Sequence, residues 1–296
     1  MTSTLAGVLS ALIGTMSCMP ARAQDTPRSN VRKLPYDTRI DVAVTSVGAV
    51  WLATSELLKP VLVPEKCRWC YRGEDGTDLL NPYDSWVRRQ LIWKQPSTAD
   101  ITSSIIAFAI EPLSTIGLNA VAAANDRNAR GVPVDALLVI EATMIAGNVN
   151  QVAKYAFARE RPFVHYLPRA PKEVRKLTAS PSDDNLSFFS GHTTLAFAVA
   201  TSSGTVSSLR GYRLAPLVWA AGLTMAASVG YLRMAGDKHY FSDVMTGVVV
   251  GSLIGVGVPL IFHSAKSSAD ANPPSASGLA LSGAPMRSAF SLNGAW

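Results

Sequence analysis

Two of the four histidines stand beside residues that could equip them for nucleophilic or acid–base chemistry. His239 and Asp243 lie four positions apart in RMAGDKHYFSD, residues 233–243, so at a helix start their side chains would share a face. A carboxylate placed there can accept the proton of one ring nitrogen and leave the other nitrogen free to attack. A solvated loop with a weak ion pair is the alternative interpretation.

The second histidine follows a Ser-Gly pair in FFSGHTT, residues 188–194. Ser190 precedes an apolar run and is expected near a helix N-cap, while Gly191 adds no side chain. The free N–H groups of such a helix end can bind an anion, and His192 would stand at the mouth of that site. A capping serine beside an incidental histidine explains this stretch equally well when it is taken alone.

Three cations complete the candidate site. Lys154 and Arg161, in KYAFARERP, are seven residues apart, so we expect them on one face of a helix that Pro162 ends. Arg233 precedes His239 by six residues. A cationic helix end that stabilises the helix dipole is the alternative for the first pair. Together, these cations, the backbone N–H groups and two histidines could bind a tetrahedral oxyanion, with the histidines as nucleophile and acid.

Six apolar segments are expected to position these clusters, and their lengths and helically spaced small residues favour helices. The segments are residues 42–55, 101–124, 136–153, 190–209, 214–232 and 244–262. In an up-and-down bundle, the ends of the third and fifth segments lie on the same side as the starts of the fourth and sixth. The clusters occupy those four ends, so the sequence predicts an all-α bundle of about six helices with the clusters together.

The composition favours a bundle embedded in a membrane. Hydrophobic residues make up 48% of the 296 positions, and the last two segments each contain 19 uncharged residues, a length that suits a membrane span. Gly247, Gly251 and Gly255 recur every four residues, which allows close helix packing in lipid. A glycine-rich buried helix of a soluble bundle is the alternative. The net charge of +6 suits anionic partners, and no basic-aromatic motif indicates nucleic acid.

The N-terminal segment predicts export. An apolar stretch over residues 5–19 leads to Ala21-Arg22-Ala23, the A-x-A pattern of a cleavage site, although a first membrane helix is an alternative. In an exported chain, Cys67 and Cys70 of CRWC are most simply a local disulfide. No second cysteine pair or nearby histidine completes a zinc set, so no metal site is expected.

The predicted organisation has four parts. A signal peptide, residues 1–23, precedes residues 24–99, which hold a linker, a short apolar helix and the cysteine pair. The catalytic bundle covers residues 100–263, and a low-complexity tail covers residues 264–296. Of the remaining histidines, His165 is interpreted as a loop residue and His263 as a residue at a helix end.

In their order, the three clusters resemble the motifs of the type 2 phosphatidic acid phosphatase (PAP2) and vanadium haloperoxidase superfamily. That pattern reads K-x6-RP, then PSGH, then SR-x5-H-x3-D. The chain matches it except that Phe189 replaces the proline and Leu232 replaces the serine. The resemblance covers roughly residues 100–262 and implies a PAP2-like helical bundle.

The resemblance also implies a role for each matched residue. His239 would attack phosphorus and become a phosphohistidine, Asp243 would orient it, and His192 would protonate the leaving oxygen and later activate water. The phosphoryl oxygens would be held by the other matched residues, Lys154, Arg161, Ser190, Gly191 and Arg233. The expected reaction is hydrolysis of a phosphomonoester or pyrophosphate, of a lipid or a small phosphoester, without a metal or other cofactor.

Three other functions compete with a lipid phosphatase. A soluble periplasmic acid phosphatase would use the same groups, and a haloperoxidase would hold vanadate in the same pocket. A non-catalytic envelope protein that only binds anions is the third. The sequence leaves the leaving group and the oligomeric state open.

The expected location depends on the first apolar segment. Residues 42–55 are few for a membrane span, and if they lie beside the membrane of an exported chain, the next two segments return the site to the periplasm. We therefore expect an inner-membrane protein whose site faces the periplasm. Six cations in residues 159–176 oppose this orientation, because cytoplasmic loops are usually the positive ones. A soluble periplasmic bundle and a cytoplasmic site are the alternatives.

Overall fold

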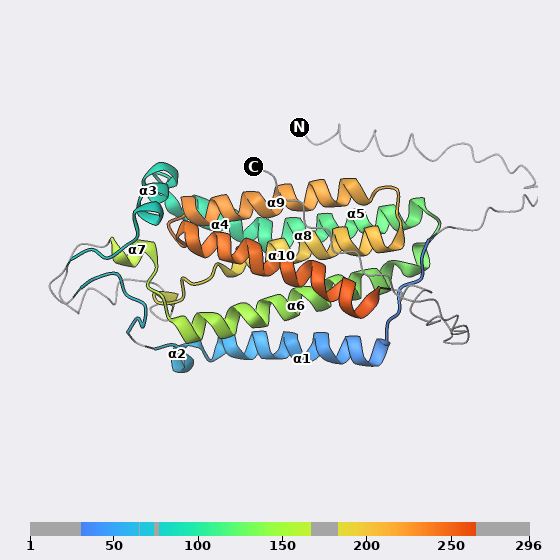
Figure 1. Ribbon diagram of the computed structural model, residues 1–296, viewed down its shortest axis with the longest axis horizontal. Coiled ribbons are helices and arrows are strands. Elements are labelled where there is room, and N and C mark those ends of the chain that lie inside the picture. Colours follow the sequence, from blue (N-terminus) through green and yellow to red (C-terminus); the bar gives the residue numbers. More distant parts are fainter. Residues whose placement is uncertain (1–30, 65, 74–76, 167–182, 265–296) are drawn as a thin grey trace, which may run out of the picture.

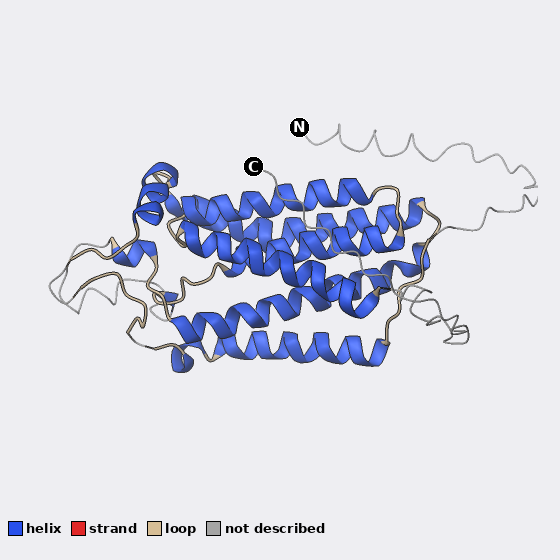
Figure 2. Ribbon diagram, in the orientation of Figure 1, coloured by secondary structure: helices blue, strands red, loops and turns tan. Residues whose placement is uncertain are grey.

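The computed structural model describes residues 31–64, 66–73, 77–166 and 183–264. Every regular element named in this part of the chain is helical, so the all-α prediction is confirmed (Figure 2). The predicted signal peptide, 1–23, lies outside the described residues, as does all but the first residue of the predicted tail.

In the described part of the chain, six long helical rods lie side by side and alternate in direction (Figure 1). In chain order they are α1 (Thr38–Leu57), a continuous rod of α4 (Pro96–Ile105), the π-helical turn η1 (Ile106–Ile110) and α5 (Glu111–Asn125), then α6 (Val132–Phe157), α8 (Gly191–Arg210), α9 (Ala215–Ala235) and α10 (Phe241–His263). Helix α8 contacts α5, α6, α9 and α10 and forms the centre of the bundle.

Short elements gather at the two ends of the bundle. Helices α2 (Lys59–Leu62), α3 (Pro82–Leu91) and α7 (Pro162–His165) lie at the end where α1, α6 and α9 finish and α4, α8 and α10 begin (Figure 1). We call this the loop end. The 3-10 turn η2 (Ala129–Gly131) lies at the opposite end, which we call the far end.

The glycine repeat on α10 allows that helix to pack closely against α8. A Cβ atom at Gly251 would lie 2.4 Å from the Thr194 carbonyl oxygen, and one at Gly255 would lie 2.2 Å from Thr201 Oγ1. Several hydroxyl groups of α8 donate within the helix; Thr201 Oγ1, for example, donates to the Phe197 carbonyl at 2.6 Å. These threonines are therefore buried on the central helix without polar partners on the neighbouring helices.

The outer faces of the rods are apolar. Large aliphatic side chains are exposed on several of them, among them Val47 on α1, Leu113 on α5 and Leu253 on α10. In the described chain, five stretches are long and apolar enough to cross a membrane: 38–57, 96–125, 129–157, 215–235 and 241–263. Exposed apolar rods of this length indicate a membrane protein.

The expectation that the first apolar segment is too short to span is wrong. The side chain of Asp37 caps α1 by accepting from the Arg39 N–H at 2.9 Å, and the helix reaches 20 residues because Asp41 is buried within it. Helix α1 runs antiparallel to α6, where Asn148 Nδ2 donates to the Gly48 carbonyl at 3.1 Å. If α1 crosses the membrane, its first residue and the loop end lie on opposite sides.

Candidate active site

A cavity of about 680 Å³ lies at the loop end of the bundle. Six of the eight residues expected to act in catalysis or phosphate binding line it: Lys154, Arg161, Gly191, His192, Arg233 and His239. They come from the end of α6, the segment after it, the start of α8, the end of α9 and the loop before α10. The three clusters therefore meet, as the up-and-down arrangement predicts.

Lys154 and Arg161 reach the cavity from different kinds of backbone. The expectation that they share a helix face is wrong, because α6 ends at Phe157 and Ala158 adopts a left-handed conformation with φ 41°. Arg161 then lies in extended backbone at φ −78° and ψ 154°. The turn at Ala158, and not a common helix face, brings the two cations together.

These two cations are available to bind an anion. Arg161 Nε donates to the Asp183 carbonyl at 2.7 Å, and its Nη1 donates to the Lys238 carbonyl at 3.3 Å. Carbonyl groups hold the guanidinium in place without neutralising it. Among the described residues, no carboxylate forms an ion pair with Lys154 or with Arg161. Both side chains are largely buried, so an anion in the cavity would gain strongly from their charge.

The third cation has a carboxylate partner that the sequence motifs did not indicate. Arg233 Nη1 pairs with Asp100 and also donates to Ser103 Oγ at 3.0 Å. Asp100 lies 3.3 Å from Lys238 as well, so one α4 carboxylate holds two cations at the rim of the cavity. Asp100 was missed because its segment carries no motif of its own.

The start of α8 matches the expected anion site in one respect and differs in another. Ser190 is the N-cap residue, but its hydroxyl is buried against Thr193 Oγ1 at 2.8 Å and does not line the cavity. Gly191 does line it, with a Cβ position only 2.8 Å from Asn150 Oδ1 and 3.0 Å from Lys154 Nζ. The absent side chain is what lets the ammonium group approach the helix N-terminus.

We expect Gly191→Ala to lower kcat/KM by at least about tenfold while leaving the protein folded, because the new methyl group displaces the Lys154 ammonium. The matched control is Gly117→Ala on α5, where a Cβ meets nothing within 4 Å. Steady-state kinetics on both purified variants, with thermal unfolding as the fold check, give the comparison. Equal activity of the two variants would contradict this account of Gly191.

His192 is held by contacts from the α4–η1 rod. Its Nε2 lies 3.0 Å from Ser104 Oγ, and its ring centroid lies 4.7 Å from that of Phe108. These contacts fix the ring at the cavity wall. Because either ring nitrogen can carry the proton, the contact with Ser104 suits both an acid and a base.

His239 has a defined tautomer. Its Nδ1 lies 2.7 Å from the Ser187 carbonyl oxygen, which can only accept, so Nδ1 carries the proton. Burial, together with the charges of Arg161 and Arg233, holds the pKa of His239 well below its ordinary value. The imidazole is therefore neutral near pH 7, and Nε2 keeps the lone pair that a nucleophile needs.

Asp243 does not bond directly to His239. Its Oδ2 lies 3.8 Å from His239 Nδ1, and instead accepts from Ser187 Oγ at 2.6 Å and from the Tyr240 N–H at 2.9 Å. The expected stacking fails because α10 begins at Phe241, so His239 precedes the helix and Asp243 lies in its first turn. Ser187 therefore links the two residues: its hydroxyl donates to Asp243, and its carbonyl oxygen accepts the hydrogen bond from the imidazole N–H.

Arg159 is the partner of Asp243, and the motifs gave it no role. The fully buried guanidinium pairs with Asp243 through Nη1 and with Asp84 of α3 through Nη2 at 2.8 Å. Its carbon lies 4.5 Å from the ring of Trp69 and 4.3 Å from that of Tyr240.

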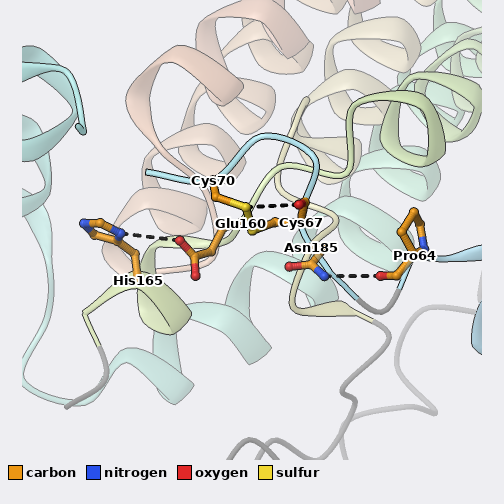
Figure 3. Close-up of a disulfide and its surroundings, with 6 residues drawn as sticks. All are labelled: Pro64, Cys67, Cys70, Glu160, His165 and Asn185. Atoms are coloured by element: carbon orange, nitrogen blue, oxygen red, sulfur yellow. Dashed lines mark hydrogen bonds and ion pairs between the residues drawn. A yellow bond between two sulfur atoms is a disulfide. The ribbon is translucent and has the colours of Figure 1, made fainter. Parts of the chain in front are cut away.

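The cysteine pair holds the segment that covers Arg159. Cys67 and Cys70 form a disulfide (Figure 3). Trp69, inside this loop, accepts at its carbonyl from the Glu160 N–H at 3.2 Å. The disulfide loop therefore packs beside the backbone that carries Arg159, which gives this pair a structural role near the site.

Residues 135–267 match the family model described as the PAP2 superfamily. The matched region contains all three of the clusters that line the cavity. A lipid A 1-phosphatase of Porphyromonas gingivalis is 34% identical over 112 residues. That match covers 38% of this chain and 20% of the relative, so the chain spans about a fifth of the protein it resembles.

One solved structure resembles this chain in part. It is a transmembrane PAP2-type phosphatidylglycerolphosphate phosphatase from Bacillus subtilis, with a TM-score of 0.44 and 19% sequence identity. The alignment covers 70% of this chain and 93% of that chain.

Proposed function

We propose that this chain is a phosphatase that hydrolyses a phosphomonoester or pyrophosphate of a membrane lipid through a phosphohistidine on His239. The observation that carries the proposal is the state of His239, a neutral imidazole with its Nδ1 proton held by Ser187, in a cavity that also holds Lys154 and Arg161. A PAP2 domain and a relative named lipid A 1-phosphatase support the same reaction class.

In the first step, Nε2 of His239 attacks phosphorus and the bond to the leaving oxygen breaks. His192 must enter this step protonated, although burial holds its pKa well below the ordinary value, and it gives its proton to that oxygen. Lys154, Arg161 and the N–H groups at the start of α8 hold the three remaining phosphoryl oxygens as negative charge spreads over them. The product of this step is a phosphorylated His239 and a neutral alcohol or the shortened phosphate.

In the second step, His192 is neutral and accepts a proton from a water molecule. The resulting hydroxide forms the new P–O bond while the P–N bond to His239 breaks. The electron pair returns to Nε2, inorganic phosphate leaves, and His192 again carries a proton. The chain's own residues supply every group in this cycle, and we propose that it runs without a metal.

The shape of the cavity supports a lipid substrate. Beside the charged groups, its lining includes Leu52 of α1, Phe108 of η1 and Leu195 of α8. Leu52 and Phe108 belong to rods with exposed apolar faces, so the cavity has both cationic and apolar lining residues. A substrate with a phosphate head and an acyl or prenyl tail would contact both parts.

The proposal is tested by phosphate release from the purified full-length protein in detergent. The panel pairs a lipid phosphate and a lipid pyrophosphate with short soluble esters, and each is assayed with a chelator present. We expect the lipid substrates to turn over faster than the soluble ones, without loss on chelation. Faster turnover of the soluble esters would contradict the proposal of a lipid substrate. Dependence of turnover on added metal would contradict the proposal of a metal-free reaction.

We further propose that the site faces the periplasm, because the disulfide lies beside it and disulfides persist in oxidising compartments. This orientation, with α1 crossing, places residue 38 in the cytoplasm and is incompatible with export of the chain from residue 24 onward. Alkaline phosphatase fused after Ser182, in the segment between α7 and α8, should be active, and a fusion after Arg130, at the far end, inactive. The reverse pattern would place the site in the cytoplasm.

A further inference from the structure

Three buried side chains meet at the far end of the bundle, away from the active site. Asp41 lies in the first turn of α1, Glu141 on α6, and His263 at the last position of α10. They are 5%, 5% and 2% exposed, and one potential ligand atom from each lies within 4.8 Å of the others. The sequence analysis gave His263 no function beyond its position at a helix end.

The tautomer of His263 leaves a lone pair directed at a carboxylate. Its Nδ1 lies 3.1 Å from the Pro35 carbonyl oxygen, which can only accept, so Nδ1 carries the proton. Nε2 then lies 3.3 Å from Glu141 Oε2, and neither atom has a hydrogen-bond partner. Two buried electron pairs that face each other at this distance repel unless a cation lies between them.

The charges around this cluster also favour a bound cation. Among the described residues, no lysine or arginine pairs with Asp41 or Glu141. Asp135, another buried carboxylate at the far end, has its charge compensated by its neighbours. It pairs with Arg210 at 2.6 Å and accepts a hydrogen bond from the Tyr212 hydroxyl at 2.6 Å. Two buried carboxylates beside an apolar surface are costly without such compensation.

We propose that Asp41, Glu141 and His263 bind one divalent first-row transition cation, for which zinc is the natural probe. One imidazole nitrogen and two carboxylate oxygens are a ligand set that zinc accepts, with a fourth position for water. The Pro35 carbonyl holds the other ring nitrogen, which is the support that metal-binding histidines usually have. The cation would neutralise the cluster and tie α1 to α6 and α10. It is separate from the proposed phosphatase chemistry.

The direct test is metal content of the purified full-length protein, stripped with a chelator, reloaded with zinc and desalted. We expect about one zinc per chain in the wild type, and at least a tenfold lower content in Asp41→Asn and His263→Ala. The matched control is Asp37→Asn, four residues before Asp41, because asparagine also caps a helix and this side chain is outside the cluster. The control should bind zinc as the wild type does.

Two measurements on the wild type keep the test independent of how the variants fold. Cobalt added to the stripped protein should give a visible absorption band that zinc abolishes, and zinc should raise the Tm of the stripped protein by several degrees. Wild-type protein that retains no zinc after desalting would overturn the proposal and show that a proton alone occupies the cluster. Equal zinc content in Asp41→Asn, His263→Ala and the wild type would overturn it too.

Discussion

His239→Ala should release phosphate from a lipid phosphate at least about 1,000-fold more slowly than the wild type, because it removes the atom that forms the covalent intermediate. The remaining cations and helix N-terminus still bind the substrate, so the loss should fall on kcat. The measurement is steady-state phosphate release by detergent-purified protein, with substrate binding followed separately.

A second buried histidine provides the matched control for this variant. His165 lies 3.2 Å from Asp78 and 3.4 Å from Glu160 and does not line the active-site cavity. We expect His165→Gln to keep kcat within a fewfold of the wild type. A folded His239→Ala protein that keeps more than about a tenth of wild-type kcat would rule out His239 as the nucleophile.

Two arginines only two residues apart should respond in opposite ways to the same substitution. Arg159→Leu leaves the carboxylates of Asp84 and Asp243 buried without their shared cation, which typically costs about 3–5 kcal/mol of unfolding free energy. Arg161→Leu removes a guanidinium held by carbonyl groups, so we expect little change in stability but at least about a 100-fold loss of kcat/KM.

Thermal unfolding in detergent and phosphate-release kinetics, applied to both variants, separate the two effects. The expected pattern is a large drop in Tm for Arg159→Leu and a near-normal Tm with poor kinetics for Arg161→Leu. If Arg159→Leu were as stable as the wild type, the buried ion pairs would not support the loop end. If Arg161→Leu kept its activity, Arg161 would not contact the phosphoryl group.

The helix order and the meeting of the clusters could be predicted because they depend on local patterns. Long uncharged runs define helices, and alternation of direction decides which helix ends share a side. Lys154, His192 and Arg233 lie at such ends, so their convergence needed no knowledge of packing.

Features that depend on a single backbone turn could not be predicted in this way. Whether Arg161 continues the α6 helix depends on the left-handed conformation of Ala158, a residue with no preference for it. The relation between His239 and Asp243 depends on where α10 begins, and a start two residues earlier would have stacked them. Sequence boundaries are uncertain by about this much.

Contacts between distant segments were also beyond the sequence. Arg159 is paired with Asp84, which lies 75 residues earlier in a region without a recognisable motif. The length of α1 was underestimated because Asp41 and Glu56 were taken as its limits, although the helix continues through both charges. Whether a distant segment buries a charged side chain can be seen only in the folded protein.

The most direct test of the account is to trap the covalent intermediate. A substrate with a labelled phosphoryl group and a good leaving group needs little help from an acid in the first step, so His192→Ala should form the phosphoenzyme and fail to hydrolyse it. We expect His192→Ala to carry a label that is stable in alkali and labile in acid, and mass spectrometry should map it to His239. The label should be absent when His239 is also replaced. A label on another residue, or turnover without any label under these conditions, would contradict the proposed role of His239.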